Sequence, residues 1–170
     1  MKWITIVLLI VAAIALAGAV AALIGSRLPR SHHATAERLL PMPPDTLWRL
    51  LTDVERFPSW RRDVKRVRRL PDRNGKPAWV EEGRSGKMTF AFERMEPRRV
   101  LVTRIADPTL PFGGTWTLEI TPAPEGARLR ITEDGEIYNP LFRFMARFIF
   151  GYDGTIAGYF SALERTAHGV

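Results

Sequence analysis

An apolar run from Trp3 to Ile24, broken only by Thr5, constrains this chain more than any other feature. A helix rises 1.5 Å per residue, so the run would extend about 33 Å, enough to cross a hydrocarbon core of roughly 30 Å. Basic residues flank it, with Lys2 before the run and Arg27 and Arg30 after it. The run therefore predicts a single transmembrane helix.

A cleaved secretory signal is the competing interpretation, because Ala19-Val20-Ala21 has the small-x-small pattern of a processing site. We favour a retained anchor for two reasons. The apolar run exceeds the usual core of about 7 to 15 residues in signal peptides, and it continues through Leu23 and Ile24 beyond the candidate cleavage point. Basic residues on its two sides are nearly balanced, so the positive-inside rule leaves the side of the membrane that holds the rest of the chain undetermined.

Length and composition divide the chain into three parts: an anchor at 1–25, a polar tether at 26–33 and one folded domain at 34–170. The folded part is long enough for its own core and too short for two ordinary domains. The chain has no cysteine, which excludes disulfides, thiol nucleophiles and thiolate metal sites. Adjacent His32 and His33 have no third ligand nearby in the sequence, so we expect no metal.

Turn signals and hydrophobic patterns predict an alternation of short elements in the folded part. We expect a first strand at 34–40 and two short helices between 43 and 60. Six further strands are expected at 64–71, 77–83, 87–96, 99–106, 114–121 and 127–137. The short connections suit antiparallel pairing. A long terminal helix is expected from Asn139-Pro140 onward, with an apolar stripe from Leu141 to Leu163.

Several segments together resemble a known superfamily. They are Pro44 to Asp53 with Phe57 to Trp60, Trp79 to Glu82, Gly113 to Trp116, Ile131 to Ile137, and Asn139-Pro140. Over about 34–166 the chain is similar to the START-related SRPBCC superfamily, which includes polyketide cyclase/dehydrase-like and coenzyme Q-binding proteins. This resemblance implies an α+β helix-grip fold. In that fold two short helices follow the first strand, and a curved antiparallel sheet of about seven strands wraps around a long C-terminal helix.

The resemblance also implies an apolar cavity between the sheet and the terminal helix. Strand alternation and helical spacing give its expected lining: Met88, Phe90, Phe92, Trp116, Leu118, Met145, Phe148, Tyr152 and Tyr159. Aromatic and methionine side chains suit a pocket for an apolar ligand, but they equally suit a filled core. Both interpretations stay open at this point. We expect no cofactor.

Glu133 is the best polar candidate for this cavity. By alternation it shares a strand face with Ile131, and a buried carboxylate needs a partner. Arg104 is one possible partner, although the pattern of its strand does not decide which way it points. Glu81 or Glu82 could join them. The alternative is a structural salt bridge at the rim of the sheet.

Basic residues gather between residues 56 and 73, where only Asp63 and Asp72 oppose them. Such a patch attracts nucleic acid or anionic lipid, and beside a membrane anchor the lipid surface is the nearer partner. We expect no nucleic acid. The candidate lipid contacts are Arg61, Arg62, Lys65, Arg66, Arg68 and Arg69. A solvated strand face is the alternative interpretation.

Three function classes follow from these observations. The leading hypothesis is a single-pass membrane protein, held by residues 3–24, that binds a hydrophobic small molecule or lipid without conventional catalytic machinery. The second is a polyketide cyclase, aromatase or dehydratase-like enzyme in the same cavity, with Glu133 as a weak candidate base and Tyr138 or Tyr152 as hydrogen-bond donor. The third is a membrane-surface interaction module without a ligand.

Overall fold

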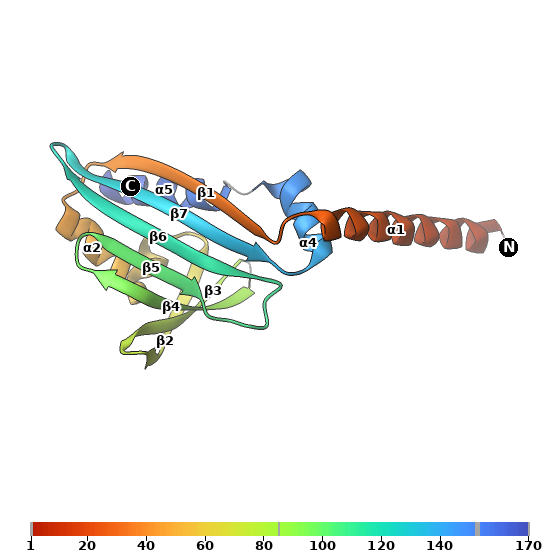
Figure 1. Cartoon of the computed structure of the whole chain (residues 1–170), viewed down its shortest axis with the longest axis horizontal. Helices are drawn as coiled ribbons and strands as arrows, with labels where there is room; N and C mark the ends of the chain where they lie inside the picture. The colour runs from red at the N-terminus through yellow and green to blue at the C-terminus, as the bar shows by residue number, and fades with distance from the viewer. Residues whose placement is uncertain (1, 85, 152–153, 170) are drawn as a thin grey trace.

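Seven strands form one antiparallel sheet in the order β1-β7-β6-β5-β4-β3-β2 (Figure 1). The computed structural model describes residues 2–84, 86–151 and 154–169. The strands are β1 Ser31–Leu40, β2 Val64–Arg73, β3 Lys76–Gly83, β4 Gly86–Glu96, β5 Val100–Ile105, β6 Phe112–Ala123 and β7 Gly126–Ile137. Strands β2 to β7 pair in sequence order, and β1 pairs with β7 at the opposite edge from β2.

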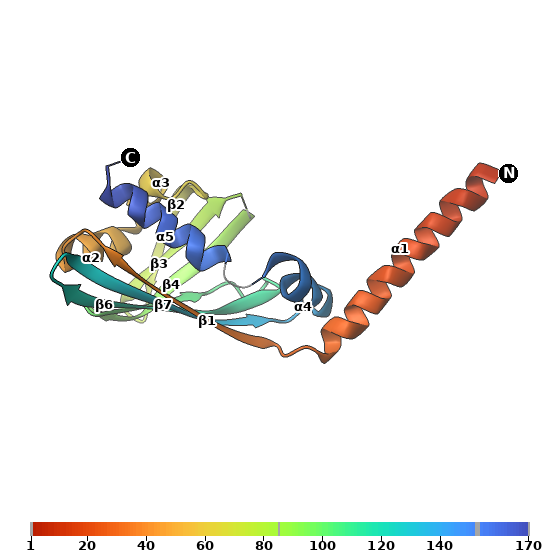
Figure 2. The same cartoon turned by 90° about the horizontal axis from the view of Figure 1, so that it is seen from above.

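Helices lie over one face of the sheet and at one of its ends. They are α1 Lys2–Arg27, α2 Pro44–Thr52, the 3₁₀ turn η1 Val54–Arg56, α3 Phe57–Trp60, α4 Pro140–Met145, the π-helical turn η2 Ala146–Phe150 and α5 Gly154–Ala167. The sheet curves around α5, and we call the face beneath α5 the concave face. Helix α4 lies at the end of the sheet from which α1 departs (Figure 2).

Local sequence accounts for several of these boundaries. Pro44 and Pro140 each occupy the first turn of a helix, where the missing backbone N–H costs nothing. Asn139 caps α4, because its Oδ1 accepts a hydrogen bond from the Phe142 N–H at 3.1 Å. Asn74, at φ 51°, forms the tight turn between β2 and β3. The predicted α+β helix-grip class with seven strands is confirmed.

The C-terminal helix is confirmed over α5, but it begins later than we expected. The apolar stripe from Leu141 onward is divided between α4, η2 and α5. Gly151 follows η2 at a φ of 72°, a backbone conformation that L side chains rarely adopt and that ends a helix. The first part of the stripe is therefore free to take a direction different from that of α5.

The tether is also shorter than predicted. Helix α1 continues to Arg27 and β1 begins at Ser31, so only residues 28–30 connect them. Residues 31–33, expected in the tether, pair with Glu136, Gly135 and Asp134 of β7. The polar composition of this segment suggested a linker, whereas a strand satisfies its backbone hydrogen bonds.

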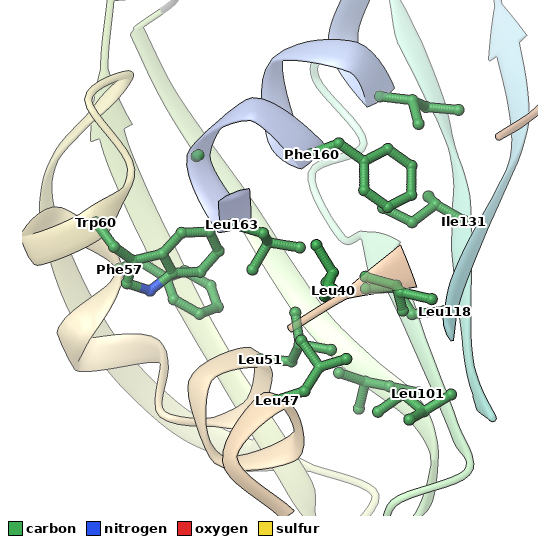
Figure 3. Packing of buried hydrophobic residues seen from close by; sticks show 14 of the residues in the cluster. Leu40, Leu47, Leu51, Phe57, Trp60, Leu101, Leu118, Ile131, Phe160 and Leu163 are labelled. Atoms are coloured by element: carbon green, nitrogen blue, oxygen red, sulfur yellow. The ribbon is translucent and has the colours of Figure 1, made fainter. Parts of the chain in front are cut away.

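The core lies between α5, α2 and the middle of the sheet. Phe160 and Leu163 of α5 point toward Leu40, Leu118 and Ile131 of the strands, and Leu47 and Leu51 of α2 close the space from another side (Figure 3). All seven are buried. This cluster fills the part of the concave face beneath the C-terminal half of α5 with side chains.

Helix α1 stands apart from this core. None of its most apolar stretch is buried, and it is the one candidate membrane span in the described part of the chain. Its length and composition fit a membrane span or a signal sequence.

Candidate functional site

The concave face has a packed part and an open part, and the same strands build both. In the packed part Leu118, Leu129 and Ile131 are buried. Toward the α4 end the inward side chains become half-buried. We call this region the open part; it consists of His32, Met88, Phe90, Thr103, Trp116 and Glu133. The register places three of them side by side, because Trp116 lies opposite both Thr103 and Glu133.

A histidine and a carboxylate meet at the β1–β7 edge of the open part. Nε2 of His32 lies 3.4 Å from Oε1 of Glu133, and the two side chains are 15% and 18% exposed. The other oxygen, Oε2 of Glu133, is buried and has no hydrogen-bond partner among the described residues. A buried carboxylate oxygen without a donor is costly. The Glu133 carboxylate is therefore incompletely hydrogen-bonded within the described part of the chain.

His32 holds its place because residue 135 is a glycine. A Cβ on Gly135 would lie 2.1 Å from Cε1 of His32, so the ring lies directly over the β7 backbone. We missed His32 as a site residue because it was assigned to the tether. Its signal was alternation: it lies two residues before Ala34 and therefore faces the same side of β1.

A second polar cluster lies on the β3 side of the concave face. Arg61 Nη1 and Trp79 Nε1 both donate to Oε1 of Glu81, each at 3.0 Å, and Arg61 Nη2 donates to Asp63 Oδ2 at 2.8 Å. The Glu81 side chain is 5% exposed. Burial works against the charge on Arg61, but the Glu81 carboxylate beside it raises the pKa of the guanidinium above its ordinary value. We did not predict this cluster, whose chemistry is that of a buried structural ion pair.

Tyr159 of α5 separates the two clusters. Its ring lies 5.5 Å from that of Trp116 in the open part, and 5.4 Å from the ring of Trp60 on α3. The Arg61 guanidinium lies 5.4 Å from the same tyrosine ring. Burial raises the pKa of the Tyr159 hydroxyl well above its usual value, with Arg61 opposing the shift, so the phenol stays protonated at neutral pH.

Six of the nine predicted lining residues lie on the concave face or on α5 above it. Phe92 and Leu118 are buried in the packed core. Met88, Phe90, Trp116 and Tyr159 are half-buried. The predicted lining thus divides into core residues and residues of the open part. Which of them touch a ligand stays a prediction.

The other three predicted lining residues come from the region between β7 and α5. Met145 is half-buried at the end of α4. Phe148 of η2 is exposed and packs beside Phe144, with ring centroids 5.0 Å apart, so it lies outside the packed interior. This differs from our expectation because η2 is not part of the helix over the sheet. Tyr152 lies outside the described residues.

Arg104 does not face Glu133, which corrects our prediction. It lies opposite Ala91 and Thr115, whose strand neighbours Phe92 and Trp116 point inward, so alternation places it on the outer face. There it forms an ion pair with Glu93 that raises the pKa of its guanidinium.

Two other polar candidates also point away from Glu133. Tyr138 is exposed and donates a hydrogen bond to Glu136 Oε2 at 2.9 Å. Glu82 lies 3.0 Å from the ammonium of Lys87. Among the described residues, His32 is the polar partner that the structure brings to Glu133.

The basic patch is smaller than predicted, because Arg61 is mostly buried with Glu81. The remaining five candidates, Arg62, Lys65, Arg66, Arg68 and Arg69, are exposed on or just before the edge strand β2. Arg69 also pairs with Asp72 at 3.2 Å. Charges on an edge strand discourage edge-to-edge pairing with other chains. Contact of these five residues with anionic lipid stays a prediction.

The domain has two surface depressions. One, of about 580 Å³, is lined by residues around Pro44, Arg98 and Thr121. The other, of about 430 Å³, has Arg104, Thr115 and Asp134 in its wall. His32 of the open part also lines the second depression, whereas Phe90, Trp116 and Glu133 line neither. Within the described part of the chain no group of three or more His, Asp or Glu side chains could hold a metal ion.

A family model described as "Polyketide cyclase / dehydrase and lipid transport" matches residues 31–158. The chain belongs to this family. The match begins where β1 begins and ends within α5, so it includes the whole concave face and excludes α1. None of the curated proteins compared with the chain matches it by sequence.

Several solved structures have the same fold. Protein MLL2253 from Mesorhizobium loti is 21% identical, with a TM-score of 0.62 over 82% of this chain and 98% of that chain. A START superfamily protein from Mycobacterium smegmatis is 18% identical, with a TM-score of 0.63 over 83% and 99%. The Zhui aromatase/cyclase from Streptomyces sp. R1128 is 13% identical, with a TM-score of 0.64 over 81% and 94%. At these identities the likeness shows the fold alone.

Membership of the family, together with the START-like fold, supports a ligand-binding cavity on the concave side of the sheet. The family description covers both cyclase or dehydrase chemistry and lipid transport. The choice between them depends on the side chains of the open part.

Proposed function

We propose that this protein binds a hydrophobic small molecule or a lipid in the open part of its concave face, and that α1 holds it at a membrane. The observation that carries the proposal is the difference in burial along one face of the sheet. Inward side chains beneath α5 are buried, whereas Met88, Phe90 and Trp116 stay half-buried in the same strands. Large apolar surface that the fold leaves partly exposed is a suitable contact for an apolar ligand.

The energetics suit reversible binding. Removing apolar surface from water is worth about 25 cal/mol per Å², so covering roughly 200 Å² contributes about 5 kcal/mol before the costs of association. The polar groups are few, and Glu133 Oε2 supplies an acceptor that is not already occupied within the described residues. A mainly apolar ligand with one hydrogen-bond donor fits this arrangement.

Membrane anchoring rests on α1. Its apolar side chains face away from the domain along the whole helix, with Leu8, Leu16 and Leu23 all exposed. Exposed leucines over this length are unfavourable in water and favourable in a bilayer. An anchored binding domain would meet its ligand where apolar molecules are concentrated. The side of the membrane that holds the domain is left open.

Native mass spectrometry tests the ligand proposal. The full chain would be purified, reconstituted in nanodiscs made from a single synthetic lipid and released in the gas phase. We expect one apolar small molecule or lipid per chain that survives release. Thr103→Trp should remove it, because Thr103 lies between Phe92 and Trp116 on the concave face. Thr117→Trp is the matched control, since Thr117 neighbours Trp116 but points to the outer face.

An unliganded wild-type chain would contradict the proposal. So would a ligand that both tryptophan variants retain equally. Circular dichroism of both variants shows whether the fold survives, so that loss of ligand is not confused with loss of structure.

A cyclase, aromatase or dehydratase-like activity is the second candidate, and the His32–Glu133 pair favours it. A carboxylate with one free oxygen, next to an imidazole, is a suitable general base for removing a proton from an activated carbon. Tyr138 is excluded as the accompanying donor, because it bonds Glu136 on the exterior.

Turnover of a polyketide-type substrate by the full chain tests this second candidate. Glu133→Gln and His32→Gln should each lower the rate at least tenfold while preserving the fold. If no substrate is consumed by the wild-type chain, or if both variants react as fast as it does, binding alone is the function.

A further inference from the structure

Exposed apolar side chains gather at α4 and η2. Outside α1, five large apolar residues are exposed in the described part of the chain, and three of them, Leu141, Phe148 and Ile149, fall in this short segment. Phe148 is 59% and Ile149 63% exposed. Such side chains in one place mark a contact surface.

The same segment is packed against the end of α1. Gly25 is buried, and a Cβ at this position would lie 1.8 Å from the backbone oxygen of Pro140, so α1 and α4 touch through their backbones. Arg143 is almost fully buried, and its Nη1 donates a hydrogen bond to the backbone oxygen of Leu28 at 2.8 Å. A cation at the C-terminal end of a helix also offsets the partial negative charge of the helix dipole. Helix α4 is therefore fixed beside the last turn of α1.

This contact sets the depth of α4 relative to a membrane that α1 would cross. The apolar run of α1 ends at Ile24, and the contacts with α4 are made by Gly25 and Leu28. In a membrane that contains Trp3 to Ile24, α4 and η2 then lie at the boundary between the acyl chains and the headgroups. Amphipathic segments bind there with their apolar side chains inserted.

The charges around this segment suit a lipid surface. Between residues 139 and 151 the chain has Arg143 and Arg147 and no acidic residue. Arg147 is exposed, as are Arg27 and Arg30 just after α1. Basic residues close to a membrane surface attract anionic headgroups.

We propose that α4 and η2 form a second membrane contact, in which Leu141, Phe148 and Ile149 insert into the interfacial layer of the bilayer beside α1. The inference rests on the membrane anchoring by α1 proposed above. It has a consequence for the ligand site, because Phe142 of α4 stacks on Phe112 at the start of β6, with centroids 5.7 Å apart. Helix α4 thus joins α1 to the end of the sheet where the open part lies (Figure 2), and holds that end toward the bilayer.

Single-cysteine labelling of the full chain tests this contact, since the natural sequence has no cysteine. An environment-sensitive fluorophore would be attached at Phe148→Cys, at Leu9→Cys within α1 and at Glu125→Cys in the turn between β6 and β7. The chains would be placed in nanodiscs of phosphatidylcholine and phosphatidylglycerol that carry nitroxide-labelled lipids. We expect a shallow nitroxide to quench position 148 severalfold more than position 125, and a deep nitroxide to quench position 9.

A second variant tests whether the native apolar side chains, and not the attached fluorophore, bring this segment to the membrane. With the label at Leu141→Cys, the change Phe148→Ser with Ile149→Ser should reduce quenching by the shallow nitroxide to the level of position 125. If position 148 is as open to aqueous acrylamide as position 125 while position 9 is quenched from within the bilayer, the second contact is wrong and the anchoring stands. If position 9 is not quenched either, the anchoring is wrong and the second contact falls with it.

Discussion

Two acidic residues on the concave face, Glu81 and Glu133, lie in opposite kinds of environment. Glu81 accepts two hydrogen bonds at 3.0 Å, from Arg61 and Trp79. Glu133 has its partner His32 at 3.4 Å, and its second oxygen has no protein donor among the described residues. Glu81 is thus held by two protein donors, whereas one oxygen of Glu133 has none within the described residues.

The difference shows how to tell structural from functional polar groups on a face of one sheet. A buried carboxylate held by a cation and a second protein donor stabilises one arrangement of the side chains around it. A mostly buried carboxylate with one oxygen that lacks a donor costs stability and persists where binding or chemistry uses it. Glu81 belongs to the first class and Glu133 to the second.

The largest expected effect is that of Glu81→Ala. Without Glu81 the mostly buried Arg61 guanidinium keeps only Asp63, whose side chain is 62% exposed, as its carboxylate partner, so we expect the free energy of unfolding to fall by about 3 to 5 kcal/mol. Urea unfolding followed by tryptophan fluorescence measures this. The double variant Arg61→Met with Glu81→Met should recover most of the loss. A Glu81→Ala chain as stable as the wild type would contradict a structural role.

The packing around the two acids predicts the next largest effect. Leu129→Ala opens a cavity in the packed part and should cost about 2 to 5 kcal/mol, whereas Met88→Ala in the open part should cost about 1 kcal/mol or less. Leu129 is fully buried and Met88 is half-buried. Thermal unfolding of the two variants compares them directly. Equal losses would mean that the open part is packed as tightly as the core.

Glu133→Gln is expected to change the free energy of unfolding by about 1 kcal/mol or less, in contrast to Glu81→Ala. The amide keeps the shape of the side chain and removes a charge whose hydrogen bonds are incomplete. The stability of the ligand complex should fall, even though the free energy of unfolding of the protein hardly changes. Ligand retention in native mass spectra, measured beside urea unfolding, separates these two quantities; a large loss of stability would instead assign Glu133 to the structural class.

The smallest effect is expected from a third acid, Glu37, on the outer face. A hydrogen bond from Arg128 is the main reason that the pKa of Glu37 lies below its usual value of 4.5, although desolvation opposes the shift and Arg130 adds to it. A lowered pKa in the folded state means that the stabilisation is present above pH 4.5 and is lost as the pH falls through the folded-state pKa.

Glu37→Gln should therefore lower the urea midpoint slightly at neutral pH, and the difference from the wild type should vanish in acid. Glu125→Gln, in the exposed turn between β6 and β7, is the matched control. A difference that grows as the pH falls would contradict the assigned sign.

Strand alternation predicted which residues face inward, and it did so well. Phe90, Phe92, Trp116 and Leu118 lie on the expected face, as does Glu133. Alternation is a local property of the backbone, so it can be read from the sequence. It gives no information on how much of a face is covered, because coverage depends on where a distant helix begins. The open part is left uncovered because α5 begins only at Gly154.

Partners that meet through tertiary structure were harder to predict. Arg61 was grouped with neighbouring basic residues, yet it turns inward to Glu81, twenty positions further along the chain. His32 and Glu133 are 101 positions apart and meet because β1 pairs with β7. Non-consecutive pairing of this kind leaves no local pattern. The prediction that Arg104 partners Glu133 was wrong for a simpler reason, since the alternation of its strand fitted either face.

The hydrogen bond between Arg143 and Leu28 joins residues 115 positions apart, and this separation orders the events of folding. During synthesis α1 emerges first, while α4 emerges only after all seven strands. The junction between them therefore closes late. Contacts so distant in sequence slow folding, because the entropy of closing the chain is lost before the contact compensates for it. A chain truncated before Pro140 would lack both the contact that holds α1 and the core side chains of α5 that cover the sheet.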